Sequence, residues 1–200
     1  MYTSQMLGLA FIMMALPSIL RKSGLGLDKI SWIYALGMLW SINFLWAPLV
    51  DRFGSQKHGH YRSWLLILQT LLIMVMIGAS FFIVPDQLHI LAGFFVLITL
   101  FSATQDIAAD ALAVTILKSE ERGLGNSIQA SGNLIGGMIG GGVVLIVYQW
   151  CGWRGSMLAL AAGTALPLIS MLGHREQPAP ADRRKEKVNY SVTILSRFSF

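Results

Sequence analysis

Charged residues are scarce in this chain. Asp, Glu, Lys and Arg together make up 12% of the 200 residues, whereas hydrophobic residues make up 54%. A typical soluble domain carries about a quarter charged residues, so this chain has too little polar surface for a soluble globular protein. The composition therefore predicts a membrane protein built of α-helices. The net charge of +5 comes mostly from short loops beside apolar segments, which is typical of membrane orientation and not of nucleic-acid binding.

Cysteine and recognisable ligand or nucleotide motifs are also lacking. The single cysteine, Cys151, cannot form a disulfide within the chain, and no Cys or His residues have the spacing of a zinc site. No GxxxxGK[ST] loop occurs, so the chain is not expected to hydrolyse nucleotide. We expect no metal, no cofactor, no nucleic-acid partner and no enzymatic activity.

Six apolar segments account for most of the chain. A helix needs about 20 residues to cross a bilayer, and each segment reaches or approaches that length. We expect membrane spans at residues 1–20, 30–50, 64–84, 88–112, 124–148 and 155–172. Residues 1–173 should form one six-helix bundle. Residues 174–200 are charged and contain prolines, so they predict a loop followed by too few residues for another span.

The basic residues predict the orientation of these spans. The loops after the second, fourth and sixth spans contain Arg52, Lys57, Arg62, Lys118, Arg122, Arg175, Arg183, Arg184, Lys185 and Lys187. The opposite side has only Arg21, Lys22, Lys29 and Arg154. Because cytoplasmic loops are enriched in Lys and Arg, we expect the N-terminus and the loop after the sixth span in the cytoplasm.

Two carboxylates, Asp106 and Asp110, lie inside the fourth apolar segment. They are four residues apart and share one helix face with Ser102. An ionisable residue within a span is a candidate for a transport pathway or a gate. Three roles remain open: binding a proton, contacting a substrate, or holding helix ends together through Arg122. At about 1.5 Å per residue, Asp106 lies about 27 Å along the helix from Leu88, near one membrane boundary, which favours the third role.

The fifth segment combines small and polar residues. Gly132, Gly136 and Gly140 recur every four residues, a spacing that lets another helix approach closely. A polar stripe lies beside them, and the second segment contributes further polar or aromatic positions. These residues either bind substrate in a cavity or bond between helices, and the candidates are Trp40, Asn43, Asn126, Gln129 and Asn133.

Several motifs resemble a known transporter family. DRFG, at Asp51–Gly54, looks like the core of the signature loop of major facilitator superfamily transporters. WAPLVDRFG, SATQDIAADALAV, SEERGLGNSIQ and GWR, in this order, resemble the AmpG-like branch, which includes muropeptide permeases and RhtX/FptX-type siderophore permeases. The DALAV ending, the GNSIQASGN run and the Gly140–Gly142 triplet look closer to the siderophore group.

This resemblance implies the N-terminal half of a twelve-helix permease, with a C-terminal six-helix half missing. It implies alternating access in the bacterial inner membrane, surrounded by lipid. The expected function is proton-coupled import of an iron-siderophore; import of muropeptide is the alternative, and a membrane enzyme or signalling protein is a further one. The cytoplasmic gate would involve Asp51, Arg52, Gly54 and Arg122. Coupling or gating would involve Gln105, Asp106 and Asp110.

Overall fold

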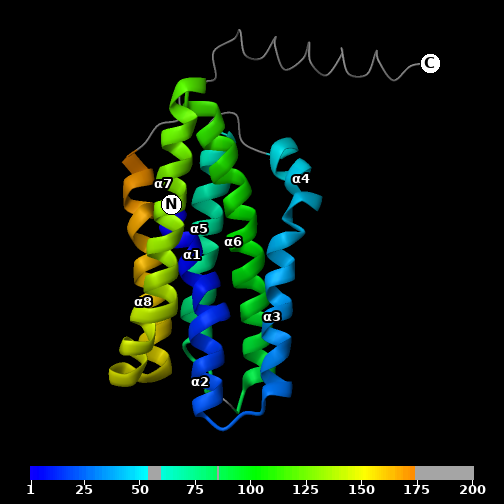
Figure 1. Cartoon of the computed structure of the whole chain (residues 1–200), viewed down its shortest axis with the longest axis vertical. Helices are drawn as coiled ribbons and strands as arrows, with labels where there is room; N and C mark the ends of the chain where they lie inside the picture. The colour runs from blue at the N-terminus through cyan, green and yellow to red at the C-terminus, as the bar shows by residue number, and fades with distance from the viewer. Residues whose placement is uncertain (54–59, 85, 174–200) are drawn as a thin grey trace, which may run out of the picture.

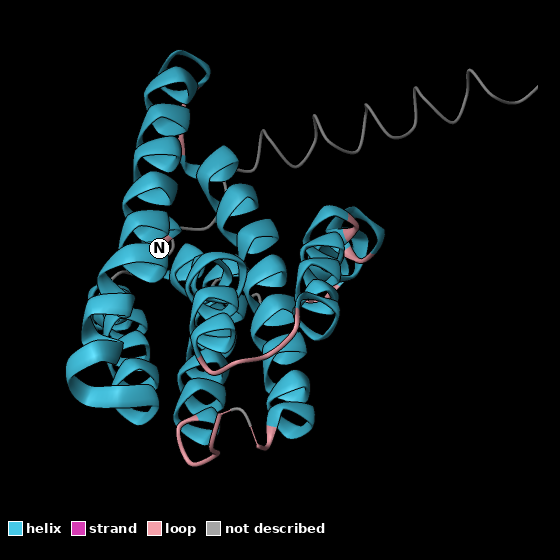
Figure 2. Ribbon diagram, turned by 60° about the horizontal axis from the view of Figure 1, so that its bottom comes forward, coloured by secondary structure: helices cyan, strands magenta, loops and turns pink. Residues whose placement is uncertain are grey.

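The computed structural model describes residues 1–53, 60–84 and 86–173, and these are almost entirely helical (Figures 1 and 2). The all-α fold class expected from the composition is confirmed. In chain order the elements are α1 (Tyr2–Ala10), η1 (Phe11–Ala15), α2 (Leu16–Lys22), α3 (Leu27–Ser41), η2 (Asn43–Leu45), α4 (Ala47–Arg52), α5 (His60–Ala79), α6 (Leu88–Ile116), η3 (Ser119–Glu121), α7 (Arg122–Met138), η4 (Ile139–Val143) and α8 (Val144–Gly173).

Four helical stretches are long and apolar enough to cross a membrane: Tyr2–Lys22, His60–Ala79, Leu88–Ile116 and Ser119–Leu168. The first combines α1, η1 and α2 and is the most enclosed of the four, because 61% of an 18-residue apolar stretch within it is buried. It lies in the middle of the bundle, where α1 contacts α6, α7 and α8 and α2 contacts α3 (Figure 1).

The expected span at 30–50 is not one continuous helix. α3 ends at Ser41, and a short η2 turn separates it from α4. Pro48 stands in the first turn of α4. Proline has no backbone N–H to continue the hydrogen bonds of the preceding helix, but it is well tolerated at a helix start. The second apolar segment is therefore a broken helix.

The spans expected at 124–148 and 155–172 form the two arms of a helical hairpin. Gly152 has φ 65° and ψ −165°, a left-handed conformation that glycine adopts without strain. The chain turns back at this residue, and the second arm of α8 rises beside the first (Figure 1). A separate loop around 149–154 was expected, but the residues on both sides of Gly152 are helical.

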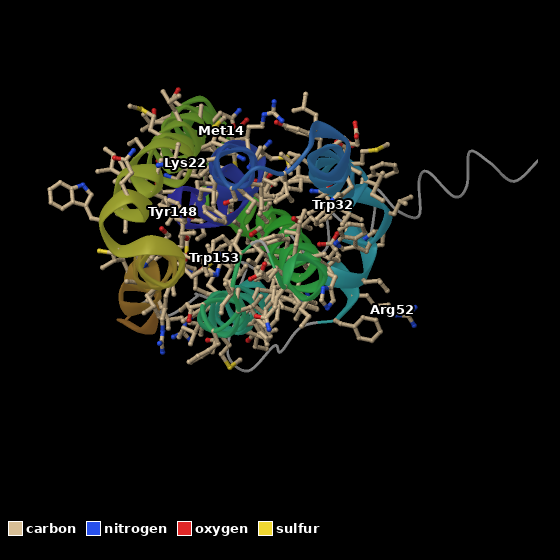
Figure 3. All side chains as sticks on the ribbon, turned by 90° about the horizontal axis from the view of Figure 1, so that it is seen from below. Met14, Lys22, Trp32, Arg52, Tyr148 and Trp153 are labelled. Carbon is tan, nitrogen blue, oxygen red and sulfur yellow. The ribbon has the colours of Figure 1, made fainter. Side chains whose placement is uncertain are left out.

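Trp153 anchors the second arm to the centre of the bundle. Its ring lies 5.8 Å from the ring of Phe11 and 6.2 Å from that of Phe95, measured between centroids. Its Nε1 donates a hydrogen bond to the Ala79 carbonyl at 3.0 Å. Figure 3 shows Trp153 inside the bundle, whereas Arg52 points away at the rim. The hairpin is thus held against η1, α5 and α6.

Candidate functional site

Asp106 and Asp110 point from α6 into contacts with other helices. The Asp106 carboxylate accepts a hydrogen bond from Gln5 Nε2 at 2.6 Å. The Asp110 carboxylate accepts from Tyr2 Oη at 3.1 Å and from Gln129 Nε2 at 2.9 Å. The two acids therefore connect α6 to α1 and α7. We call Tyr2, Gln5, Asp106, Asp110 and Gln129 the carboxylate cluster.

Helix geometry explains these pairings. Tyr2 and Gln5 are three residues apart on α1, and Asp106 and Asp110 are four apart on α6. Residues at these spacings share a helix face. The earlier residue of α1 meets the later residue of α6, which is the register of two antiparallel helices. The sequence pattern predicted the acidic face but not the donors opposite it.

Glycines bring α7 and η4 close to α1. A Cβ atom placed on Gly136 would lie 2.5 Å from the Thr3 carbonyl oxygen, and one on Gly132 would lie 3.0 Å from Tyr2 Cβ. A Cβ on Gly140 would overlap the Leu7 carbonyl. The expected packing residues therefore face the central helix. This close approach also lets Gln129, on the same helix, reach Asp110.

A second polar chain leads away from the carboxylate cluster. Gln105 Nε2 donates to Gln69 Oε1, and Gln69 Nε2 donates to the Thr164 carbonyl. All three residues are fully buried. Gln105 is thus turned toward α5, although it is adjacent to Asp106 in sequence. The chain of amides connects α6 through α5 to the second arm of α8.

The partners of both carboxylates are neutral. Arg122, which was expected to hold helix ends together through these acids, is exposed at the start of α7 and does not contact either one. Tyr2, Gln5 and Gln129 take that place. A carboxylate in a low-dielectric interior is costly unless its charge is compensated, so binding of a positive charge here would be favourable. Within residues 1–53, 60–84 and 86–173, no three His, Cys, Asp or Glu side chains are grouped for a metal.

The expected gate residues are not gathered at one point. Asp51 accepts a hydrogen bond from Tyr61 Oη at 3.0 Å, and Arg52 lies over the Phe53 ring at 5.8 Å from its centroid. Neither contacts Arg122, and Gly54 lies outside the described residues. His60 bonds to the Val50 carbonyl at 2.9 Å. These contacts fasten α4 to the first turn of α5.

The substrate-cavity candidates are also separated. Trp40 and Asn43 are half-buried on α3 and η2, on the opposite side of α6 from α7 (Figure 1). Asn126 is exposed on α7, and Gln129 belongs to the carboxylate cluster. Asn133 is half-buried, and its Oδ1 is buried without a hydrogen-bond partner.

Sequence reasoning overlooked several polar residues. Tyr2 and Gln69 were not singled out, although each is a polar group within an apolar segment. Trp46 Nε1 donates to Thr104 Oγ1 at 3.1 Å and so ties the broken second segment to α6. A search for every amide and hydroxyl inside the predicted spans would have found Gln69 and Thr104. It would not have paired them.

The chain is similar to known transport proteins. The family model for the Major Facilitator Superfamily matches residues 1–199. The anhydromuropeptide permease of Escherichia coli (strain K12) is 36% identical over 144 residues, which are 72% of this chain and 29% of that protein. An uncharacterized protein of Haemophilus influenzae is 38% identical over 138 residues, covering 68% of this chain and 32% of the relative. The putative transporter AmpG 4 of Rickettsia felis is 27% identical over 193 residues, covering 93% of this chain and 45% of the relative. The chain thus spans less than half the length of these relatives.

Proposed function

Since this chain belongs to the Major Facilitator Superfamily, we propose that it is the N-terminal six-helix half of a secondary transporter. The single observation that carries this proposal is the family match over residues 1–199. The half-buried carboxylate cluster agrees with it, because ionisable residues inside a membrane bundle commonly line transport or coupling pathways. We use "complete permease" for this half together with a second six-helix half. Alternating access would arise from rocking of the two halves about a site between them.

The proposed substrate is a muropeptide. The expectation of a ferric siderophore depended on short motifs, whereas the relative with 36% identity over 144 residues is an anhydromuropeptide permease. Two Rickettsia relatives, from R. felis and R. conorii, are described as putative AmpG transporters. These similarities favour the muropeptide alternative over siderophore import. They also favour transport over a membrane enzyme or signalling protein.

We place the complete permease in the bacterial inner membrane with a cytoplasmic N-terminus. The excess of Lys and Arg in the loops after the second, fourth and sixth apolar segments supports this orientation. The C-terminal end of α6 and the start of α7 would then be cytoplasmic, as would α4. Asp106 and Asp110 would lie in the cytoplasmic part of the bundle.

Proton binding at Asp106 is the proposed coupling step. Asp106 is held by one neutral amide donor, and its carboxylate has no cationic partner. A proton would remove the charge without requiring a large cavity. Its release would restore the carboxylate that accepts from Gln5. Asp110, fixed by two donors, is better suited to join α1 to α7.

Uptake assays will test the substrate. We expect vesicles with the complete permease to accumulate labelled anhydromuropeptide and not a labelled ferric siderophore, because the similar permease is named for the former. Accumulation should exceed that of empty vesicles and should collapse when a protonophore dissipates the proton gradient. Uptake of the siderophore alone would overturn the proposed substrate. Failure to accumulate any solute by a folded protein would overturn the transport function.

Substitution of Asp51 by Asn will test the gate. Asp51 accepts from Tyr61 and stands at the end of α4, where a carboxylate can bind donors from the second half when the cytoplasmic side is closed. We expect D51N to slow uptake without lowering the amount of folded protein, because the charge is lost while the side-chain size is kept. Asp86→Asn, which removes an exposed acid at the other end of the bundle, is the control. Wild-type uptake by D51N would exclude this role.

A further inference from the structure

In the described part of the chain, three polar atoms of Gln5 and of α6 residues close to Asp106 are buried without a hydrogen-bond partner. They are Gln5 Oε1, Ser102 Oγ and Gln105 Oε1. Gln5 and Gln105 are 0% exposed and Ser102 is 1% exposed. Buried polar atoms are nearly always paired with protein groups or ordered water. Three such atoms on neighbouring side chains therefore favour a shared hydrogen-bonding partner that is not a protein group.

Gln5 and Ser102 lie in the interface between α1 and α6, and Gln105 is turned from α6 toward Gln69 of α5. The three residues thus border the junction of α1, α5 and α6. Ser102 precedes Gln105 by three residues and Asp106 by four, so these side chains are neighbours on α6. Across the interface, the amide of Gln5 is fixed by its Nε2 bond to Asp106. Gly8 lies about one turn further along α1, and a Cβ placed on it would be 3.8 Å from Ser102 Oγ. Gln5 and Ser102 thus lie on opposite sides of the interface between α1 and α6.

We propose that this interface binds one internal water molecule. The water donates hydrogen bonds to the amide oxygens of Gln5 and Gln105 and accepts one from the Ser102 hydroxyl. An amide oxygen can only accept, whereas a hydroxyl can donate, so one water satisfies all three atoms. Three hydrogen bonds are typical of a buried water. Hard metal cations such as Ca²⁺ take about six to eight oxygen ligands, more than these atoms offer.

The water acts as a positioning group for Asp106. With its Oε1 satisfied by the water, the Gln5 amide keeps the orientation in which Nε2 donates to the carboxylate. The same molecule connects Gln5 to Gln105 and, through Gln69, to the amide chain that reaches α8. This inference does not depend on which solute the protein transports, so its test remains valid if the proposed substrate is wrong.

Oxidation of Met76 provides a direct readout. A Cβ atom placed on Gly8 would lie 2.9 Å from Met76 Cε and 3.8 Å from Ser102 Oγ. Met76 Cε and the Ser102 hydroxyl are therefore near each other. Met76 is 1% exposed. Radicals generated in bulk solution should not reach it. X-ray irradiation splits bound water in place, so it should oxidise Met76 in the complete permease, as measured by mass spectrometry. Met157, which is 0% exposed, is the control and should react in neither case.

Two variants sharpen this test. Ser102→Ala should remove most of the X-ray-dependent oxidation of Met76, because it deletes one of the three groups that hold the water. Ser156→Ala should not, because Ser156 is equally buried but its hydroxyl bonds to the Gly152 carbonyl at 3.0 Å. Wild-type Met76 that is as unreactive as Met157, or unchanged oxidation in S102A, would overturn the proposal. If S102A does not fold, the comparison of Met76 with Met157 in the wild-type protein tests the proposal by itself. Oxidation suppressed by added sodium would point to a cation instead of water.

Discussion

Replacing Gly140 with alanine is expected to destabilise the complete permease by about 1–3 kcal/mol, the usual cost of an overpacked interface. The new Cβ would overlap the Leu7 carbonyl, which belongs to the backbone of α1 and cannot rotate away. Gly136→Ala should behave similarly, because its Cβ would lie 2.5 Å from the Thr3 carbonyl oxygen. We expect a lower midpoint of thermal unfolding in detergent for both variants. Uptake should fall as well, since Gln129 could then no longer approach Asp110.

Neighbouring glycines provide matched controls for this prediction. Gly137 and Gly142 lie in α7 and η4, and a Cβ atom on either one meets nothing within 4 Å. Alanine at these positions should leave the unfolding temperature unchanged or raise it, since glycine costs about 0.5–1 kcal/mol relative to alanine inside a helix. Equal destabilisation by all four substitutions would show that close packing on α1 is not the reason for the glycine pattern.

Asp106→Asn is expected to reduce uptake to a small residual fraction of the wild-type rate. Asparagine has nearly the same size as aspartate and can still accept the hydrogen bond from Gln5, but it cannot ionise or bind a coupling proton. The loss should therefore occur without a matching loss of folded protein, measured by size-exclusion chromatography. Asp110→Asn should instead lower thermal stability, because Asp110 links Tyr2 on α1 with Gln129 on α7.

The pH dependence of uptake separates the remaining roles of Asp106. If this carboxylate binds the coupling proton, residual D106N activity should no longer vary with pH in the range where the wild type does. Asp28→Asn is the control, because Asp28 is an exposed acid in the first turn of α3. A folded D106N protein with wild-type uptake and a wild-type pH profile would exclude proton coupling at this residue. Asp106 would then have only a structural role.

Local patterns predicted most of the membrane-spanning helices. The apolar segments expected at 1–20, 64–84 and 88–112 overlap the helical stretches Tyr2–Lys22, His60–Ala79 and Leu88–Ile116, because hydrophobicity and length are properties of consecutive residues. The break after Ser41 was not predicted. A reversal between the fifth and sixth segments was predicted, but as a loop at 149–154 and not as a turn at Gly152 between helical residues. Pro48 and Gly152 were visible in the sequence. Each residue type also occurs in continuous membrane helices, so its presence alone did not decide the backbone path.

Composition, motifs and local patterns were enough to establish the membrane character, the family and the two acids as the central polar feature of the fourth segment. They also determined which residues share a helix face, since that follows from helical periodicity alone. The partners of these acids depend on the tertiary structure. Asp106 pairs with Gln5, and Asp110 pairs with Tyr2 and Gln129. Arg122 contacts neither acid. Periodicity predicts only the direction in which a side chain points from the axis of its own helix. The partner depends on which helix packs there and at what height, which is set by contacts between residues far apart in the chain.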